Sequence, residues 1–286
     1  MKHSTILDKP SIDTLAIGCF DGIHMGHQQL IRRLGKQGAL FVVDKDQANL
    51  TPGAKRALYA GYPCMFYHFL KLKDLSGEEF IALLLKEFPN LKKLVVGYDF
   101  CFGRNRAYNA YHLKTFFPGE VEIVEAFMYH GVAVHSSMIR DYLKAGEIKK
   151  ANRFLGREYS ITGNVIKGQG LGSTKLVPTL NLHITDYLLP KEGVYITRSK
   201  IGHTFYNSVS FIGKRFSTDG AFSVETHIIG EISEENREKV ELFFVDFLRE
   251  NRHFETLEAL KKQIEEDIAI AKKRLEMCHV YSIDYL

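Results

Sequence analysis

The feature that most constrains the fold of this sequence is a change of hydrophobic rhythm near residue 156. Before it, short apolar runs alternate with longer amphipathic segments, as in β-strands separated by α-helices. After it, the apolar runs are separated by short stretches of Gly, Pro, Asn and Asp, with no segment long enough for a helical crossover. The sequence therefore predicts two domains, residues 1–155 and 156–286, of different fold class.

The first half predicts a parallel sheet with helices on its faces. One helix begins near His27, and another begins at Ser76, where Ser76 and Glu79 have the spacing of a capping box. Two short helices, residues 136–145 and 147–155, are expected between the halves. The expected strands are residues 14–18, 39–43, 64–68, 94–96 and 121–124.

The second half predicts a small antiparallel β-barrel, because its short strands have no helices between them. The expected strands are residues 159–166, 193–201, 205–212 and 224–229, whereas residues 240–247 fit either a strand or a helix. Near the end of the chain, apolar residues recur at steps of three and four from Leu257 to Leu275. This spacing predicts a long amphipathic helix that covers part of the barrel.

Composition narrows the class of protein. A chain of 286 residues that is 45% hydrophobic and 25% charged is typical of a soluble globular protein. The net charge is only +4, with scattered basic residues, so nothing indicates a nucleic-acid binder. The four cysteines have no zinc spacing, the amino terminus does not resemble a signal peptide, and no apolar run is long enough to span a membrane. We therefore expect a cytoplasmic protein without membrane contacts.

The first candidate site is GCFDGIHMGH, residues 18–27, which follows the first expected strand. His24 and His27 are three residues apart, so a helical turn places both imidazoles on one side, beside unpaired backbone amides. Gly22 and Gly26 let a ligand approach the backbone, and imidazoles can stabilise charge during phosphoryl transfer. Because open parallel sheets bind ligands at the carboxyl ends of their strands, we interpret this turn as a phosphate site. The alternatives are a zinc pair, which has no third ligand at a diagnostic spacing, and an ordinary turn with two polar histidines.

Two more segments of the first half carry candidate ligand-binding residues. At residues 136–140, Ser136 and Ser137 could cap a helix, and Arg140 could reach the same phosphates with a bidentate fork. Residues 97–104 follow another expected strand and offer an acid, two aromatic rings and a base at the same edge of the sheet.

The barrel half contains a glycine-rich loop followed by a hydroxyl and an amide. The glycines are Gly168, Gly170 and Gly172, and the polar residues are Thr179 and Asn181. Free backbone amides can bind phosphate oxygens, and Thr and Asn oxygens suit a hard cation such as Mg²⁺. Glu225, in an expected strand, could act as a general base if its side chain points inward, although such a carboxylate is usually solvated.

In this order, the motifs GxFDGxHxGH, VVGxDFxFG and SSxxR resemble the bifunctional prokaryotic riboflavin kinase/FMN adenylyltransferase family, also called FAD synthetase. The resemblance continues through the second half. It implies a Rossmann-like nucleotidyltransferase domain followed by a riboflavin kinase barrel with a C-terminal helix. Such an enzyme phosphorylates riboflavin to FMN with ATP and adenylylates FMN to FAD, releasing pyrophosphate. The resemblance also implies Mg²⁺ and small-molecule partners, and we expect a monomer or a weak homo-oligomer.

The resemblance assigns roles to the matching residues. His24, His27 and Arg140 would be catalytic in adenylyl transfer, and Glu225 would activate the riboflavin hydroxyl. The adenylyltransferase would bind ATP through Gly18, Phe20, Asp21, Gly26, Ser136 and Ser137, and the flavin through Asp99, Phe100 and Phe102. The kinase would bind ATP through Gly168, Gly170, Gly172, Thr179 and Asn181, with Thr179 and Asn181 holding the metal.

The chain also departs from the family pattern. Ser137 stands where threonine is usual, and a shorter connection, residues 41–46, replaces the usual Phe-x-Pro-His-Pro segment. In the barrel, the departures are at Ser173, Leu176, Leu180 and residues 211–216, from Phe211 to Phe216. The substituted glycine loop motivates one alternative, an FMN adenylyltransferase with a non-catalytic flavin-binding barrel. A second alternative, from another class, is a non-enzymatic flavin or nucleotide sensor that has kept the folds.

Overall fold

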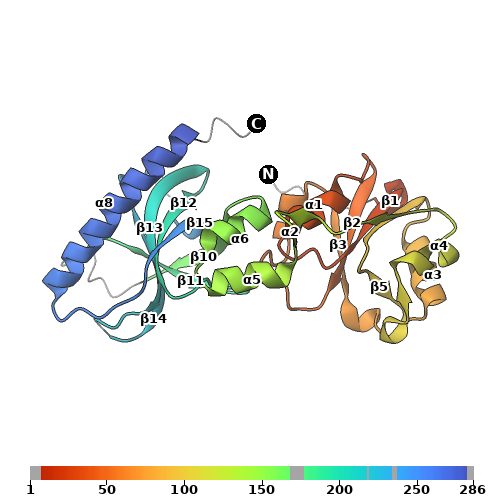
Figure 1. Ribbon diagram of the computed structural model, residues 1–286, viewed down its shortest axis with the longest axis horizontal. Helices are drawn as coiled ribbons and strands as arrows, with labels where there is room; N and C mark the ends of the chain where they lie inside the picture. Colours follow the sequence, from red (N-terminus) through yellow and green to blue (C-terminus); the bar gives the residue numbers. More distant parts are fainter. Residues whose placement is uncertain (1–7, 168–176, 218, 234–236, 282–286) are drawn as a thin grey trace. The chain divides into compact units, whose positions relative to one another are not determined.

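The computed structural model describes residues 8–167, 177–217, 219–233 and 237–281, with side chains up to residue 277. The chain forms two compact units, residues 1–136 and 137–286, which are described one at a time (Figure 1). This division lies ahead of the expected boundary at residue 156. The functional limits of the two domains stay a prediction.

The first unit is built on a five-stranded parallel sheet with the strand order β3-β2-β1-β4-β7. Its strands are β1 (Thr14–Gly18), β2 (Gly38–Asp44), β3 (Cys64–His68), β4 (Lys93–Gly97) and β7 (Glu120–Val124). All five strands were expected from the apolar runs, and the structure confirms them. The parallel order places the carboxyl ends of β1, β2 and β4 side by side.

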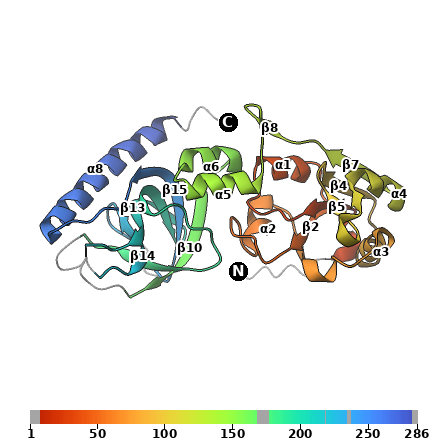
Figure 2. The ribbon, with the colours of Figure 1, turned by 60° about the horizontal axis from the view of Figure 1, so that its bottom comes forward.

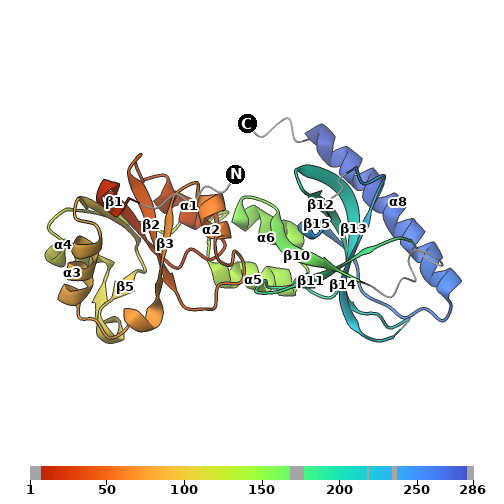
Figure 3. The same cartoon turned by 180° about the vertical axis from the view of Figure 1, so that it is seen from behind.

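Helices cover both faces of this sheet because neighbouring residues of each strand point to opposite sides. Leu15 and Ile17 pack with α3 (Gly77–Glu87) and α4 (Leu113–Phe116). Ala16, between them, packs on the other face. That face carries α1 (Met25–Ile31) and α2 (Lys55–Ala60), as Figure 3 shows. The capping box is confirmed, because Ser76 accepts from the Glu79 amide and the Glu79 carboxylate accepts from the Ser76 amide.

Several short elements of this unit were not expected. They are the 3₁₀ turns η1 (Lys9–Ser11), η2 (Phe69–Lys71), η3 (Arg104–Arg106) and η4 (Ala110–His112), the strand pair β5 (Cys101–Phe102) and β6 (Tyr108–Asn109), and the pair β8 (Met128–Tyr129) and β9 (Val132–Ala133). All are too short to leave a periodic signal.

The second unit contains a closed antiparallel barrel with the strand order β10-β11-β14-β13-β12-β15. Its strands are β10 (Tyr159–Ile166), β11 (Leu180–Ile184), β12 (Gly193–Ile201), β13 (Thr204–Lys214), β14 (Phe222–Ile228) and β15 (Lys239–Arg249). Strand β11 was not expected, and the ambiguous segment near residue 240 is a strand. Strand β15 pairs with both β10 and β12, and so closes the barrel.

Three helices belong to the second unit: α5 (Ser136–Lys144), α6 (Ile148–Leu155) and α8 (Leu257–Tyr281). Helix α6 contacts β10 and β15. Helix α8 runs along the outside of the barrel (Figure 2), where Ala271 and Leu275 pack against Val194 and Ile196 of β12. The Arg249 guanidinium donates three hydrogen bonds to the buried carboxylate of Asp267, at 3.0, 3.1 and 2.8 Å, which ties α8 to β15.

The barrel interior contains a closed ring of five hydroxyl groups, from Thr197, Ser199, Ser208, Ser210 and Thr226, all fully buried. Ser199 donates to Ser208 (2.8 Å), and Ser210 donates to Thr226 (3.0 Å). Thr197 bonds Ser208 and Ser210, both at 2.8 Å, and Thr226 bonds Ser199 at 3.2 Å. In a ring of this kind, each hydroxyl can donate one bond and accept one, so every buried polar group is satisfied.

Candidate functional site

The turn between β1 and α1 has an unusual backbone. Phe20 and Ile23 have φ values of 53° and 40°, and Gly22 has a φ of 93°. Positive φ is unfavourable for residues with a side chain, above all for a β-branched one such as Ile23. Such a backbone persists only where its surroundings hold it in place.

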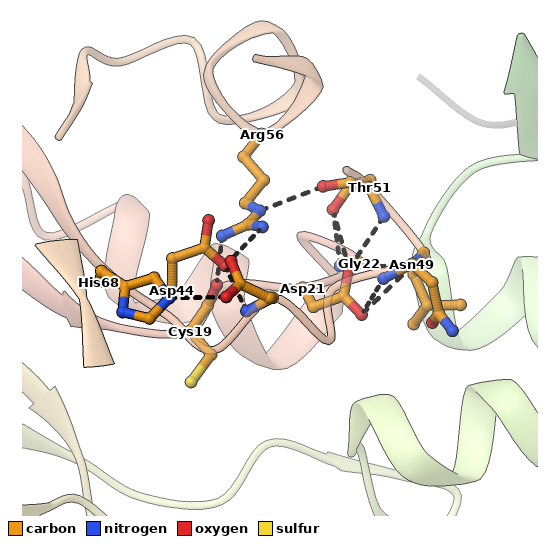
Figure 4. A network of polar contacts seen from close by, with 10 residues as sticks. Cys19, Asp21, Gly22, Asp44, Asn49, Thr51, Arg56 and His68 are labelled. Atoms are coloured by element: carbon orange, nitrogen blue, oxygen red, sulfur yellow. Dashed lines mark hydrogen bonds and ion pairs between the residues drawn. The ribbon is translucent and has the colours of Figure 1, made fainter. Parts of the chain in front are cut away.

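Asp21 holds this turn against the segment that follows β2 (Figure 4). Asp21 is 4% exposed, and its carboxylate accepts from the amides of Asn49, Leu50 and Thr51 at 3.2, 3.0 and 2.9 Å. Gly22 donates its amide to the Thr51 hydroxyl at 2.8 Å, and Ser136 donates its hydroxyl to the Asp21 carbonyl at 2.7 Å. The sequence interpretation assigned Asp21 to ATP binding. In the structure, its carboxylate instead holds the backbone of the turn through these hydrogen bonds. A contact with ATP stays a prediction.

The two histidines lie together at the start of α1. His24 is the N-cap, and its Nδ1 accepts from the His27 amide at 3.2 Å. The two rings stack with a centroid distance of 3.6 Å. A Cβ at Gly26 would lie 3.2 Å from the His24 ring and 3.4 Å from the Val134 carbonyl, so glycine at this position spares the His24 ring a tight contact. No described residue completes a metal site of three His, Cys, Asp or Glu side chains with this pair.

A cavity of about 410 Å³ lies at the carboxyl ends of the parallel strands. The expected site residues that line it are Gly18, Phe20, His24, Gly26, His27, Asp99, Phe100 and Ser136. The structure therefore brings together residues of the first unit from the β1 turn, the loop after β4 and Ser136. The cavity also contains residues that sequence reasoning missed, among them Cys19, Lys45, Phe69, Arg106 and Glu125.

The two phenylalanines of the expected flavin site have different environments. Phe100 lines the cavity, whereas Phe102 is 5% exposed and belongs to the core beneath it. The two rings stack with centroids 6.0 Å apart, and Phe102 also packs edge-on against Phe116. Phe102 therefore supports Phe100 from below, and a direct contact of Phe102 with flavin stays a prediction.

Ser137 and Arg140 lie one turn apart on α5, within the second unit. Their spacing places them on one face of the helix, as the phosphate interpretation expects. Their contact with ATP stays a prediction.

Arg56, which sequence reasoning missed, ties several parts of the first unit together (Figure 4). Its side chain is 2% exposed, and it donates to the carbonyls of Thr51 and Cys19 at 3.1 and 3.3 Å. It also pairs with Asp44 at 3.6 Å. Burial raises the pKa of the nearby Cys19 thiol, although the positive charges of Lys45 and Arg56 oppose the shift.

The barrel unit brings the expected kinase residues together around Glu225. Asn181 of β11 is the cross-strand partner of Glu225 on β14. The Glu225 carboxylate accepts from the Thr179 hydroxyl (3.4 Å) and the Ser223 hydroxyl (2.9 Å), and it pairs with Arg215 at 3.4 Å. Glu225 alternates along β14 with buried residues, so it faces away from the barrel interior. The sequence interpretation made a general base of Glu225 only if its side chain pointed into the barrel. That condition is not met, because the structure places Glu225 on the outer face, 19% exposed, so its role as a base stays a prediction.

Some expected kinase residues lie outside the described part of the chain, namely Gly168, Gly170, Gly172, Ser173 and Leu176. Among the other departures from the family pattern, Leu180 begins β11, Phe211 pairs across from Glu225, and Phe216 is half exposed. Two of these departures therefore lie directly beside the Glu225 cluster.

Comparisons with known proteins agree with this two-part arrangement. A family model described as FAD synthetase matches residues 8–49 and 59–138, and one described as riboflavin kinase matches residues 155–275. The chain is 29% identical to a bifunctional riboflavin kinase/FMN adenylyltransferase of Pseudomonas fluorescens, over 90% of this chain and 91% of that protein. A protein of the same description from Listeria monocytogenes is also 29% identical, over 88% of this chain and 89% of that protein.

One solved structure is similar along most of the chain. It is the crystal structure of a protein described as a macrolide-efflux protein from Streptococcus pneumoniae, with a TM-score of 0.82 and 27% identity. The likeness covers 92% of this chain and 94% of that one. In the part of this chain that the structure describes, no helix combines the length and apolar character needed to cross a bilayer. The two family matches lie on the two units that carry the His24 and Glu225 clusters, and the chain belongs to the family of bifunctional riboflavin kinases/FMN adenylyltransferases.

Proposed function

We propose that this chain makes FAD from riboflavin in two ATP-dependent steps. The barrel unit transfers a phosphoryl group to the 5′-hydroxyl of riboflavin, and the first unit transfers AMP from ATP to the phosphate of FMN, releasing pyrophosphate. The observation that carries the proposal is the match of both family models, each on the unit that contains the corresponding cluster.

In adenylyl transfer, the FMN phosphate attacks the α-phosphorus of ATP directly, so the protein needs no nucleophile of its own. Its task is to position the reactants and to stabilise the charge that develops on the phosphate oxygens. His24 and His27 line the cavity at the start of α1, where backbone amides and the helix dipole also favour anions. We assign the two histidines to ATP, together with Gly18, Phe20, Gly26, Ser136, Ser137 and Arg140.

In the kinase step, Glu225 accepts the proton of the riboflavin hydroxyl as that oxygen attacks the γ-phosphorus and the bond from the γ-phosphorus to the bridging oxygen breaks, releasing ADP. Its carboxylate already accepts from two hydroxyl groups, those of Thr179 and Ser223. The hydroxyl of Thr179 and the amide oxygen of Asn181 are donors that suit Mg²⁺, so these residues fit the metal. Mg²⁺ bound with ATP would neutralise charge on the phosphates. The cytoplasmic location and the oligomeric state stay predictions from the sequence.

The test is to incubate the full chain with riboflavin and Mg-ATP and to separate the flavins by chromatography over time. The proposal expects FMN to appear first and FAD to follow. If FMN accumulates without FAD, or no flavin is converted, the two-step proposal is wrong. If FAD forms from supplied FMN but none forms from riboflavin, the barrel binds flavin without phosphorylating it.

A further inference from the structure

Two acidic residues, Asp44 and Asp46, flank Lys45 in the loop after β2 and hold this loop in place through ion pairs. Figure 4 labels Asp44 and the two bases, Arg56 and His68. Asp44 pairs with the buried guanidinium of Arg56 at 3.6 Å. Asp46 pairs with the His68 ring at 2.6 Å and has a φ of 56°, so the chain turns sharply at this point. The Asp46 amide also donates to the Asp44 carboxylate at 3.2 Å. These contacts fix the backbone on both sides of Lys45.

Lys45 itself lines the cavity that contains His24 and His27. Its ammonium lies 5.0 Å from the centre of the Phe69 ring, which also lines the cavity. Among the described residues Lys45 makes no ion pair, whereas its acidic neighbours Asp44 and Asp46 pair with Arg56 and His68. The loop therefore presents a cation to the cavity without a protein counterion.

The other fully charged base that lines the cavity has a different environment. Arg106 donates to the Cys101 sulfur at 3.5 Å. The Lys45 ammonium makes no hydrogen bond or ion pair among the described residues, so it is available to an incoming anion. It is positioned by a loop that lacks the segment usual after the second strand. A lysine ammonium binds phosphate as a compact point charge with three donors.

We propose that Lys45 is a binding residue of this cavity, whose ammonium contacts a phosphate oxygen of a nucleotide reactant; the proposal rests on the proposed adenylyl transfer. Both reactants, FMN and ATP, supply that chemistry. The phosphate monoester of FMN and the triphosphate of ATP are therefore the two sources that an experiment must separate.

The first test measures binding at the cavity without turnover. Cys19 lines the same cavity and is an exposed residue, so a ligand bound there should slow its alkylation by iodoacetamide. Peptide mass spectrometry measures the alkylation of Cys19 separately from that of the other cysteines, and so reports occupancy of this cavity. FMN, ATP and pyrophosphate are titrated separately against the full chain and its Lys45→Met variant. We expect the half-protecting concentration of FMN, ATP or both to rise about tenfold in Lys45→Met, as expected for the loss of one charge-assisted hydrogen bond. The reactant that shifts identifies the phosphate.

Two matched variants give the controls. Lys45→Arg keeps the positive charge and should restore protection to within about threefold of wild type. Lys114→Met removes an exposed lysine of α4, which does not line the cavity, and should behave as wild type. Equal protection of wild type and Lys45→Met, or no protection of wild type by any of the three ligands, overturns the proposal.

The second test uses activity to separate this proposal from the proposed function. In FAD formation, Lys45→Met should raise KM for the same reactant and leave kcat within about twofold, because the contact is made in the ground state as well. Conversion of riboflavin to FMN should not change. If the protection shift is observed but wild type makes no FAD, Lys45 binds phosphate as proposed and the adenylyl transfer assignment is wrong.

Discussion

Replacement of Asp21 by Asn tests whether the strained turn is held by this carboxylate. One oxygen, Oδ1, accepts from the amides of Leu50 and Thr51, and the other, Oδ2, accepts from the amide of Asn49 and, at 3.3 Å, from that of Leu50 as well. In Asp21→Asn, the side-chain oxygen still accepts two hydrogen bonds from backbone amides, but these bonds are weaker because the acceptor is no longer charged. The new NH₂ group is a donor and faces another donor, a backbone amide, so that contact is lost. Each charge-assisted bond is worth roughly 1 kcal/mol more than a neutral one, and the mismatch adds a similar amount, so the local cost is about 3 kcal/mol.

The assay is hydrogen exchange of the amides of residues 49–51, measured by mass spectrometry on the full chain. Because a tenfold change corresponds to about 1.4 kcal/mol, we expect these amides to exchange about 100-fold faster in Asp21→Asn. Asp74→Asn is the matched control, since its side chain is 70% exposed and its one ion pair among the described residues is with the neighbouring Lys73. Unchanged exchange together with a loss of FAD formation would refute the reasoning, and would return Asp21 to a direct role in binding ATP.

Three other predictions concern the two sites and the barrel core. His27→Ala should lower kcat for FAD formation at least 100-fold without changing riboflavin phosphorylation, as flavin chromatography would show; a smaller effect removes His27 from the charge-stabilising group. Glu225→Gln should slow FMN formation by about 10²-fold or more and leave adenylylation of supplied FMN intact, and a parallel loss of both activities would contradict two separate sites. Ser210→Ala should destabilise β13 and β14 by about 1–3 kcal/mol, measured by hydrogen exchange of their amides, whereas exchange equal to wild type would show that the buried hydroxyls are satisfied without Ser210.

The strands of the first unit could be predicted because each is a short apolar run with both faces covered. The same reasoning missed β11, since Leu180–Ile184 is short and follows a motif that indicated a ligand-binding loop. It left β15 undecided, because a run such as residues 240–247 fits either period until its partners β10 and β12 are known. Pairing with distant strands, not local propensity, decided that segment.

The site was predictable where a motif is contiguous and not where it depends on distant contacts. His24 and His27 share one turn, so their placement on one side follows from their spacing, and the structure adds that the two rings stack. The partners of Asp21 lie about thirty residues further along the chain, at Thr51 and its neighbours. Arg56 has no local signal at all, because nothing near it in sequence shows that its charge is buried against two carbonyls and a carboxylate.

The hydroxyl ring of the barrel has a consequence for mispaired strands. Ser210 lies opposite Thr226, with Ile228 and Val224 as the next inward-facing residues of β14. A slip of β13 by two residues would keep every side chain on its own face and would barely disturb an apolar interior. In this barrel the same slip would place hydroxyl groups opposite apolar side chains at several positions. Each buried hydroxyl that loses its hydrogen-bond partner destabilises the fold by about 1–3 kcal/mol. The ring therefore specifies the strand register. In one alignment of β12, β13 and β14 every buried hydroxyl has a hydrogen-bond partner, and alignments shifted by two residues leave some of these hydroxyls without one.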